Sequence, residues 1–303
     1  MQEQMLSFFN KISNPFLDKA AEMVTMLGEQ YFFILVISFL FWNISKREGF
    51  KLAAAFIYSS VLNNILKISF HTLRPFEMLD YISGKRVETA TGYSFPSGHT
   101  QGATTFFITL AQILRRKWFT IAAIIVIFLI GLTRIFLGVH WPVDVVGGII
   151  FGVIMAFVFC TIIDNYYDDR SVLLRRIFFR IQSVIVLLAF GLYIFDLVYL
   201  KGSMKIDDFF KIAGISTGAI YGFFAEEWWV DFSAEDASWF LKITRWLIGL
   251  VVTAAIMVGL KIVLPQHHLA DFLRYGLVGL WITFLWPAVG VKIRLFTKRS
   301  RVD

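Results

Sequence analysis

The stretch from Thr133 to Asp144 carries the most reactive combination of side chains in the chain, reading T-R-I-F-L-G-V-H-W-P-V-D. Pro142 suits the first turn of a helix, which places Asp144 in that turn and His140 just before it. A carboxylate there can hold the Nδ1–H of the imidazole and leave Nε2 free as a nucleophile or base. Arg134 lies near the end of the preceding apolar run, where a guanidinium can clamp an oxyanion. Alone, this stretch is equally compatible with a capped helix start and a snorkelling arginine.

Two earlier blocks carry side chains that suit the same chemistry. The block K-x6-R-P begins at Lys67 and contains Arg74, and the block P-S-G-H occupies residues 96–99. If the helix that carries Lys67 continues to Arg74, the two cations share one of its faces. With Arg134 they would form a trication suited to the three oxygens of a phosphoryl group. Repulsion among such cations needs an anion to offset it, and phosphate is the natural one.

The P-S-G-H block also predicts an anion site made of backbone groups. Ser97 is a good helix N-cap, and Gly98 leaves backbone N–H groups open to a ligand at the N-terminus of the helix that follows. His99 falls on the same turn. The alternative is an ordinary helix start with a chance histidine, which the presence of the other two blocks disfavours.

Taken in order, K-x6-R-P, P-S-G-H and (S/T)-R-x5-H-x3-D resemble the three signature blocks of the type 2 phosphatidic acid phosphatase (PAP2) superfamily. That superfamily includes lipid phosphate phosphatases, undecaprenyl pyrophosphate phosphatases, glucose-6-phosphatase and vanadium haloperoxidases. Thr133 stands where the family most often has serine, and it keeps the hydroxyl. The resemblance covers residues 20–165 and says nothing specific about residues 180–303.

The resemblance implies a role for each matching residue. The histidine matching His140 attacks phosphorus and forms a phosphohistidine, while the aspartate matching Asp144 holds it. The histidine matching His99 protonates the leaving oxygen and then activates water. The groups that would stabilise the charge on the phosphoryl oxygens are Lys67, Arg74, Arg134, Ser97 and the Gly98 N–H. No cluster of carboxylates accompanies them, so neither a Mg²⁺ site nor another cofactor is implied.

The composition indicates a membrane protein. Hydrophobic residues make up 57% of the chain and charged residues 17%, which excludes an ordinary soluble domain. The single cysteine, Cys160, excludes an intramolecular disulfide. The net charge of +7 does not indicate a nucleic-acid partner, because the basic residues cluster at the ends of apolar runs. We therefore predict an all-α, polytopic bundle of about nine spanning helices. Their expected ranges are 24–44, 51–70, 98–114, 118–138, 142–163, 182–200, 209–225, 240–264 and 270–293.

These spans predict four parts and an orientation. Residues 1–23 suit an interfacial amphipathic segment, 24–165 the catalytic membrane core, 166–181 a cytoplasmic linker, and 182–303 a C-terminal transmembrane extension of unknown role. Basic residues gather in one set of loops, which positive-inside orientation assigns to the cytoplasm. Those segments are Ser45–Phe50, Arg115–Lys117, Asp164–Arg180 and the tail from Lys292. All three signature blocks then fall on the extracytoplasmic face of the plasma membrane.

The C-terminal part leaves two questions open. Gly214, Gly218 and Gly222 form a small-residue stripe for close helix packing or for a homodimer. Charges in or near apolar runs, such as Asp271 and Arg274, indicate either a second polar site or interfacial anchoring with one buried pair.

The leading functional prediction is a phosphatase acting on a membrane lipid phosphate or pyrophosphate of the phosphatidate, phosphatidylglycerophosphate or undecaprenyl pyrophosphate type. The alternative enzyme is a phosphotransferase that passes the phosphoryl group to a lipid or glycan. A transporter or scaffold with a relic site is disfavoured by the complete motif, and a haloperoxidase by the membrane embedding.

Overall fold

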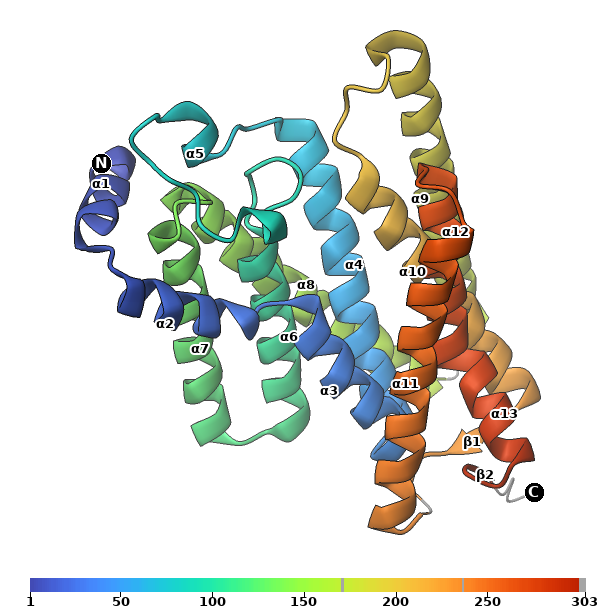
Figure 1. Cartoon of the computed structure of the whole chain (residues 1–303). Coiled ribbons are helices and arrows are strands. Elements are labelled where there is room, and N and C mark those ends of the chain that lie inside the picture. The colour runs from blue at the N-terminus through green and yellow to red at the C-terminus, as the bar shows by residue number, and fades with distance from the viewer. Residues whose placement is uncertain (170–171, 236, 300–303) are drawn as a thin grey trace. The chain divides into compact units, whose positions relative to one another are not determined.

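The computed structural model describes residues 1–169, 172–235 and 237–299, and most of them are helical (Figure 1). Arg170 and the end of the basic tail lie outside the described residues. The contacts divide the chain into two compact units. The first consists of Met1–Ile34 and Tyr58–Thr161, and the second of Leu35–Ile57 and the chain from Ile162 onward. The helices α3 (Gln30–Asn43), α4 (Lys46–Phe70) and α8 (Pro142–Asp169) each contribute to both units.

The all-α, multi-pass fold class is confirmed. Within the described ranges, seven helical segments are long and apolar enough to cross a membrane: Pro15–Asn43, Lys46–Met78, Lys117–Phe136, Pro142–Tyr167, Val172–Leu200, Trp239–Val263 and His268–Lys292. The other two expected spans are also helices, α6 (Gly98–Leu114) and α10 (Asp207–Trp229), but they fall outside this set. The helix α6 has only 17 residues, and both helices bury more than half of their residues, which need not be compatible with lipid.

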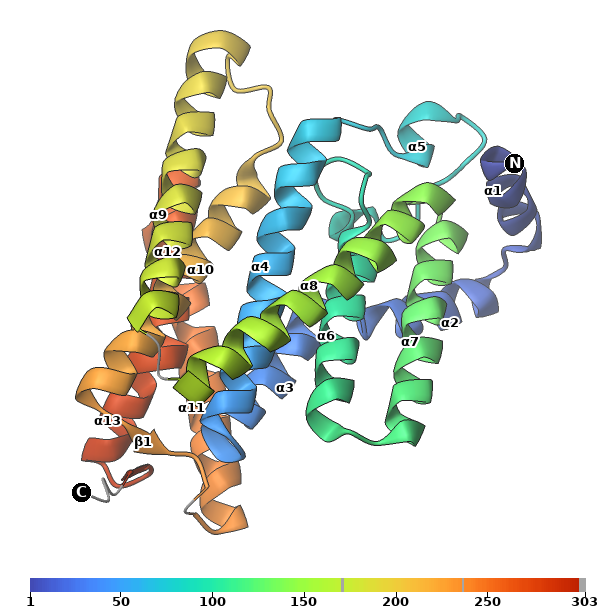
Figure 2. The ribbon, with the colours of Figure 1, turned by 180° about the vertical axis from the view of Figure 1, so that it is seen from behind.

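The first unit contains the three signature blocks. Besides its parts of α3, α4 and α8, its elements are α1 (Gln2–Ile12), α2 (Pro15–Met26), α5 (Pro75–Met78), η1 (Val87–Thr89), α6 and α7 (Lys117–Phe136). The helices α6 and α7 form an antiparallel hairpin, and α2 runs across it (Figures 1 and 2). The expected interfacial segment is two helices, because the chain turns at Ser13 and Asn14, and Asn14 caps α2.

Buried polar side chains link α4 to α6 beneath the P-S-G-H block. The Asn63 amide donates to the carbonyl of Pro96 at 3.1 Å and to Gln101 Oε1 at 2.9 Å. Gln101 donates in turn to the carbonyl of Ser59 at 2.9 Å, and the Ser59 hydroxyl bonds Thr105 at 2.8 Å. Buried polar groups are costly unless they are paired, so this chain of bonds fixes the register of α6 on α4.

The second unit consists of helices and one short sheet. Besides its parts of α3, α4 and α8, it contains α9 (Val172–Phe195), η2 (Asp196–Leu200), α10, β1 (Phe232–Ser233), α11 (Trp239–Val263), α12 (His268–Leu280), η3 (Trp281–Leu285), α13 (Trp286–Lys292) and β2 (Thr297–Lys298). The two strands pair antiparallel, with Phe232 opposite Lys298. Here η2 and η3 are π-helical turns that continue α9 and α12.

The glycine stripe of α10 packs against α12 and η3 of the same chain. A Cβ on Gly214 would lie 2.2 Å from the carbonyl oxygen of Phe272, and one on Gly218 would lie 1.9 Å from that of Gly276. Gly222 similarly lies against Thr283. Close packing, the first of the two expected uses, therefore occupies this face, and a homodimer through the same glycines would have to displace α12.

Some charged residues of the second unit form ion pairs in which at least one partner is buried. Lys46, which is 9% exposed, bonds Glu226 at 2.8 Å and Asp231 at 3.0 Å. Asp271 and Arg274 form an ion pair on the first turns of α12. The pairing of Asp271 with Arg274 matches the expectation of one buried pair better than that of a second polar site.

Candidate active site

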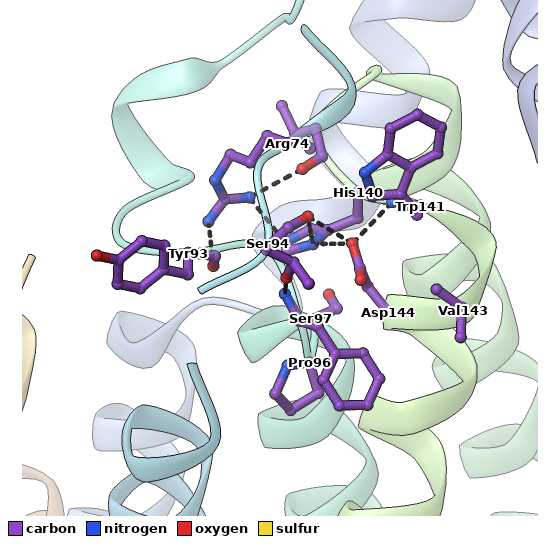
Figure 3. Close-up of polar contacts among 12 residues, drawn as sticks. Arg74, Tyr93, Ser94, Pro96, Ser97, His140, Trp141, Val143 and Asp144 are labelled. Carbon is purple, nitrogen blue, oxygen red and sulfur yellow. Dashed lines mark hydrogen bonds and ion pairs between the residues drawn. The ribbon is translucent and has the colours of Figure 1, made fainter. Parts of the chain in front are cut away.

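The His140–Asp144 pair forms where α8 begins. Pro142 starts the helix, and Asp144 in its first turn folds back toward the preceding loop. Oδ2 of Asp144 accepts from the backbone N–H of Trp141 at 2.8 Å and lies 3.2 Å from His140 Nδ1 (Figure 3). Both residues are 1% exposed. The carboxylate therefore holds the imidazole in one orientation, as the spacing predicts.

Arg74 determines which nitrogen of His140 carries the proton. Its Nη1 lies 3.1 Å from His140 Nε2, and a guanidinium has no acceptor, so Nε2 must accept this bond. The proton is then on Nδ1, facing Asp144. Burial, followed by the positive charges of Arg74 and Arg134, holds the pKa of His140 well below its usual value. The imidazole is consequently neutral at pH 7, with its Nε2 lone pair on the side of the cations.

Ser94 adds a third donor to the same carboxylate oxygen. Its hydroxyl lies 2.5 Å from Asp144 Oδ2 and 3.5 Å from His140 Nδ1, and its side chain is fully buried (Figure 3). Its backbone N–H donates to the carbonyl of Thr72 at 2.8 Å. Ser94 therefore ties the loop between the first two signature blocks to the third block.

Replacing Ser94 with alanine should lower kcat more than it raises KM. A hydrogen bond to a charged group contributes roughly 1.5–3 kcal/mol, and losing part of it from the oriented pair would reduce kcat about 10- to 100-fold. Thr104→Val is the matched control, because Thr104 is also fully buried but bonds the carbonyl of Thr100 within its own helix. Steady-state kinetics of both variants test this. Equal losses of kcat would show that Ser94 only supports folding.

Lys67 and Arg74 meet for a different reason from the one expected. The helix α4 ends at Phe70, so the two residues do not share a helical face. They converge because both donate to the carbonyl of Thr91, at 2.9 Å from Lys67 Nζ and 2.7 Å from Arg74 Nη2. Arg74 also bonds the carbonyl of Tyr93 at 3.2 Å (Figure 3). A turn of the connecting loop thus brings together the cations of the first block.

The P-S-G-H block forms the N-terminus of α6, as the sequence predicts. The Ser97 side chain caps the helix by accepting from Thr100 N at 3.5 Å. Gly98 and His99 are its first residues, so their backbone N–H groups have no intrahelical acceptor. A Cβ on Gly98 would lie 3.3 Å from Asn63 Oδ1 and 4.0 Å from Lys67 Nζ. The absence of a side chain at Gly98 therefore lets the helix N-terminus approach Lys67 closely.

Arg134 and His99 carry side-chain nitrogens that no other described residue bonds. Arg134 is fully buried, and its Nη1 donates to Thr25 Oγ1 at 3.1 Å. Its Nε and Nη2 have no hydrogen-bond partner among the described residues, and neither has His99 Nε2. Unsatisfied buried polar groups are costly, and a functional site that binds an ion is one explanation for them. The first unit therefore brings all eight predicted site residues into a structure that can receive an anion. They are Lys67, Arg74, Ser97, Gly98, His99, Arg134, His140 and Asp144.

Three residues in this structure were missed by sequence reasoning. Ser94 bonds Asp144, Thr25 bonds Arg134, and Asn63 supports the carbonyl of Pro96. Ser94 lies just before the P-S-G-H block, and Asn63 lies one helical turn before Lys67, so their positions beside motifs were the available signals. Nothing in the sequence points to Thr25, which is distant from all three blocks.

Comparisons with known proteins identify two matching family models. Residues 48–168 match the model described as the PAP2 superfamily. Residues 210–299 match a second model, described as the transmembrane extension of PAP2 superfamily phosphatases. The two models together include the first unit's signature blocks and most of the C-terminal helices.

Two named relatives and one solved structure each match about half of this chain. An undecaprenyl-diphosphatase of Sulfolobus acidocaldarius is 32% identical over 43% of this chain and 63% of its own length. The phosphatidylglycerophosphatase B of Bacillus subtilis is 28% identical over 48% of this chain and 75% of its own length. The crystal structure of Aquifex aeolicus LpxE is 28% identical, with a TM-score of 0.47, and the match covers 53% of this chain and 94% of that one. The match to the Sulfolobus protein thus spans less than two thirds of that relative.

Proposed function

We propose that the chain belongs to the PAP2 superfamily, whose models match residues 48–168 and 210–299, and that it is an integral membrane phosphatase that hydrolyses a lipid phosphate or pyrophosphate through a phosphohistidine intermediate. The relatives named above are a lipid diphosphatase and a phospholipid phosphatase, which supports this class of substrate.

The observation that carries the proposal is the set of unpartnered donors beside a neutral, oriented histidine. Arg134 Nε and Nη2 and His99 Nε2 have no hydrogen-bond partner among the described residues. A phosphoryl group offers three oxygens and needs several charge-assisted donors at once. Together with the N-terminus of α6, this set suits a phosphoryl group better than a carboxylate, which offers only two oxygens.

In the first chemical step, His140 Nε2 attacks phosphorus in line with the leaving oxygen. Arg74 Nη1 bonds that lone pair in the structure, so binding of the phosphoryl group must exchange this bond for one to a phosphate oxygen. The N–P bond then forms as the P–O bond to the lipid breaks. His99 enters this step as an imidazolium, which the negative charge of the bound phosphoryl group favours, and gives one proton to the departing oxygen. Asp144 stabilises the positive charge that develops on the imidazole of His140.

In the second step, water attacks the phosphohistidine and releases inorganic phosphate. His99, which has lost its proton in the first step, takes one from the water and so returns to its initial state. Arg134, Lys67 and the N–H groups of Gly98 and His99 hold the phosphoryl oxygens through both steps. The protein thus works mainly by positioning and by electrostatic stabilisation.

We assign the site to the extracytoplasmic face of the plasma membrane, which follows from the distribution of basic loops. Residues 1–23 would lie in the interface, 24–165 would form the catalytic core, 166–181 a cytoplasmic linker and 182–303 the transmembrane extension. A lipid headgroup could then enter at the membrane surface while its chains stay in the bilayer. Because α12 covers the glycine stripe of α10, a homodimer would use another face.

Activity should not require a divalent metal. No group of three or more His, Cys, Asp or Glu side chains within the described ranges is placed to hold a metal ion, and the cations themselves suit the charge of phosphate. Phosphate release from a panel of lipid phosphates should persist in EDTA.

Orthovanadate should inhibit competitively, because five-coordinate vanadate on His140 resembles the transition state. Loss of activity in EDTA that Mg²⁺ restores would contradict the proposed chemistry, and adding candidate lipid acceptors to the same assay would reveal a phosphotransferase.

A further inference from the structure

Arg86 lies outside the signature blocks, but the fold places its positive charge at the same end of the first unit as the candidate site. It precedes η1 and has a left-handed backbone, with φ of 57°. Its neighbour Lys85 anchors the loop, because Lys85 N–H donates to the carbonyl of Leu137 at 2.9 Å and its ammonium pairs with Asp18 at 2.6 Å. The Arg86 guanidinium bonds Glu29 through Nη2 at 2.5 Å. Its position is therefore set by bonds on both sides of the loop.

The C-terminal end of α2 connects Arg86 to the candidate site. Glu29, the partner of Arg86, lies four residues after Thr25, which bonds Arg134. Gly28 lies against the backbone of His99, since a Cβ there would be 3.5 Å from the His99 carbonyl oxygen. Arg86 is also one of the cations whose electrostatic field reaches His99. The Arg86 guanidinium thus belongs to the part of the site that contains His99 and Arg134.

Arg86 retains donor capacity after its bond to Glu29. Its Nε is buried and has no hydrogen-bond partner among the described residues, as is also true of two N–H groups of Arg134. The side chain as a whole is 17% exposed, so part of it is open to solvent. One phosphoryl group can be held by the cations of the signature blocks, and Arg86 then offers charge for a second anionic group.

We propose that Arg86 binds the second phosphoryl group of a lipid diphosphate, and so makes the site selective for diphosphates over monophosphates. This inference rests on the function proposed above and specifies its substrate class. The terminal phosphoryl group would occupy the site at His140, and the phosphoryl group next to the lipid would lie on the side of His99.

The proposal agrees with the charge changes in the reaction. When the terminal P–O bond breaks, its electron pair goes to the bridging oxygen, and the leaving group is a lipid monophosphate. Negative charge therefore increases on the phosphoryl group beside His99, where a guanidinium stabilises it. The leaving group of a lipid monophosphate is an alkoxide that carries no phosphoryl group, so Arg86 stabilises its departure much less.

The test compares two pairs of ligands in Arg86→Gln and in the unchanged protein. The first pair is a prenyl diphosphate and a prenyl monophosphate of equal chain length, compared by kcat/KM. The second pair is methylenediphosphonate and inorganic phosphate, compared by their inhibition constants. The variant should lose at least tenfold more kcat/KM for the diphosphate than for the monophosphate, and affinity for methylenediphosphonate should fall more than that for phosphate. Equal changes within both pairs would overturn the proposal.

Two further variants separate ligand binding from anchoring of the loop. Glu29→Gln removes the partner of Arg86. If Arg86 only anchors the loop, this variant should lose the diphosphate preference as Arg86→Gln does. Our proposal instead predicts that the diphosphate preference is kept or increased. Lys85→Gln removes the neighbouring anchor and should keep that preference. Loss of the preference in Glu29→Gln and Lys85→Gln would assign Arg86 to anchoring. Absence of hydrolysis of either lipid by the unchanged protein would instead count against the proposed function itself.

Discussion

His140→Ala should abolish turnover of every substrate, including activated aryl phosphates. Without Nε2 there is no atom to form the bond to phosphorus, and no neighbouring group can replace it, since Asp144 is held by Ser94 and Trp141. The improved leaving group of an aryl phosphate does not compensate for a missing nucleophile. The expected result is therefore a loss that is independent of the leaving group.

His99→Ala should give a loss that depends on the leaving group. A general acid typically contributes about 10²–10⁴-fold, and nitrophenolate needs far less protonation than a lipid alkoxide. The first step with nitrophenyl phosphate should therefore be much less affected than the first step with a lipid monophosphate. If His99 also activates water in the second step, the variant should accumulate phosphohistidine from the aryl substrate.

Rapid-quench labelling of the two variants with radioactive aryl phosphate measures both predictions. Label should appear on His99→Ala and be absent from His140→Ala. Label on the His140→Ala protein would show that the two roles are assigned wrongly. Equal losses for aryl and lipid substrates in His99→Ala would remove the evidence for an acid at that position.

Motif spacing predicted the parts of the structure that depend on local chain geometry. Pro142 and Asp144 share the first turn of α8, and Ser97 caps α6, because both features arise within a few residues. The apolar runs likewise predicted most helices to within a few residues. The exceptions are segments such as α9, which begins at Val172 rather than near residue 182, because its first turns carry basic residues at the expected membrane boundary.

Contacts between distant segments were beyond what spacing can predict. The meeting of Lys67 and Arg74 depends on a loop carbonyl at Thr91, although helical periodicity had suggested the same outcome for another reason. The bonds from Thr25 to Arg134 and from Glu29 to Arg86 depend on α2 lying across α7. A single sequence contains no local signal for such pairs, because each partner satisfies requirements that the tertiary fold creates.

Arg134→Gln should reduce kcat/KM strongly and yet raise the stability of the protein without ligand. Losing one donor to the transition state costs about 10²–10³-fold in rate. Arg134 is fully buried with two N–H groups that have no hydrogen-bond partner in the described part of the chain. The substitution removes the cost of burying the Arg134 charge and the repulsion between Arg134 and Arg74, both of which oppose folding. The thermal midpoint in the absence of anions should therefore increase.

Arg245→Gln is the matched control, since Arg245 is also fully buried but its guanidinium is occupied. It donates to Asn43 Oδ1 and to the carbonyl of Ala234, each at 2.7 Å, and to the carbonyl of Leu295 at 3.4 Å. Hydrogen bonds to charged groups contribute roughly 1.5–3 kcal/mol each, so this substitution should lower the thermal midpoint. The two variants are expected to change stability in opposite directions.

Orthovanadate separates these effects from general changes in stability. A ligand that binds only the folded state raises the thermal midpoint, and at a fixed ligand concentration the increase grows with the logarithm of its affinity. The unchanged protein and Arg245→Gln should therefore be stabilised by vanadate, whereas Arg134→Gln should lose most of that stabilisation. Thermal unfolding in detergent, with and without vanadate, measures all three proteins under one condition. A lower midpoint for Arg134→Gln without ligand, with vanadate stabilisation retained, would show that Arg134 supports the fold and does not hold the anion.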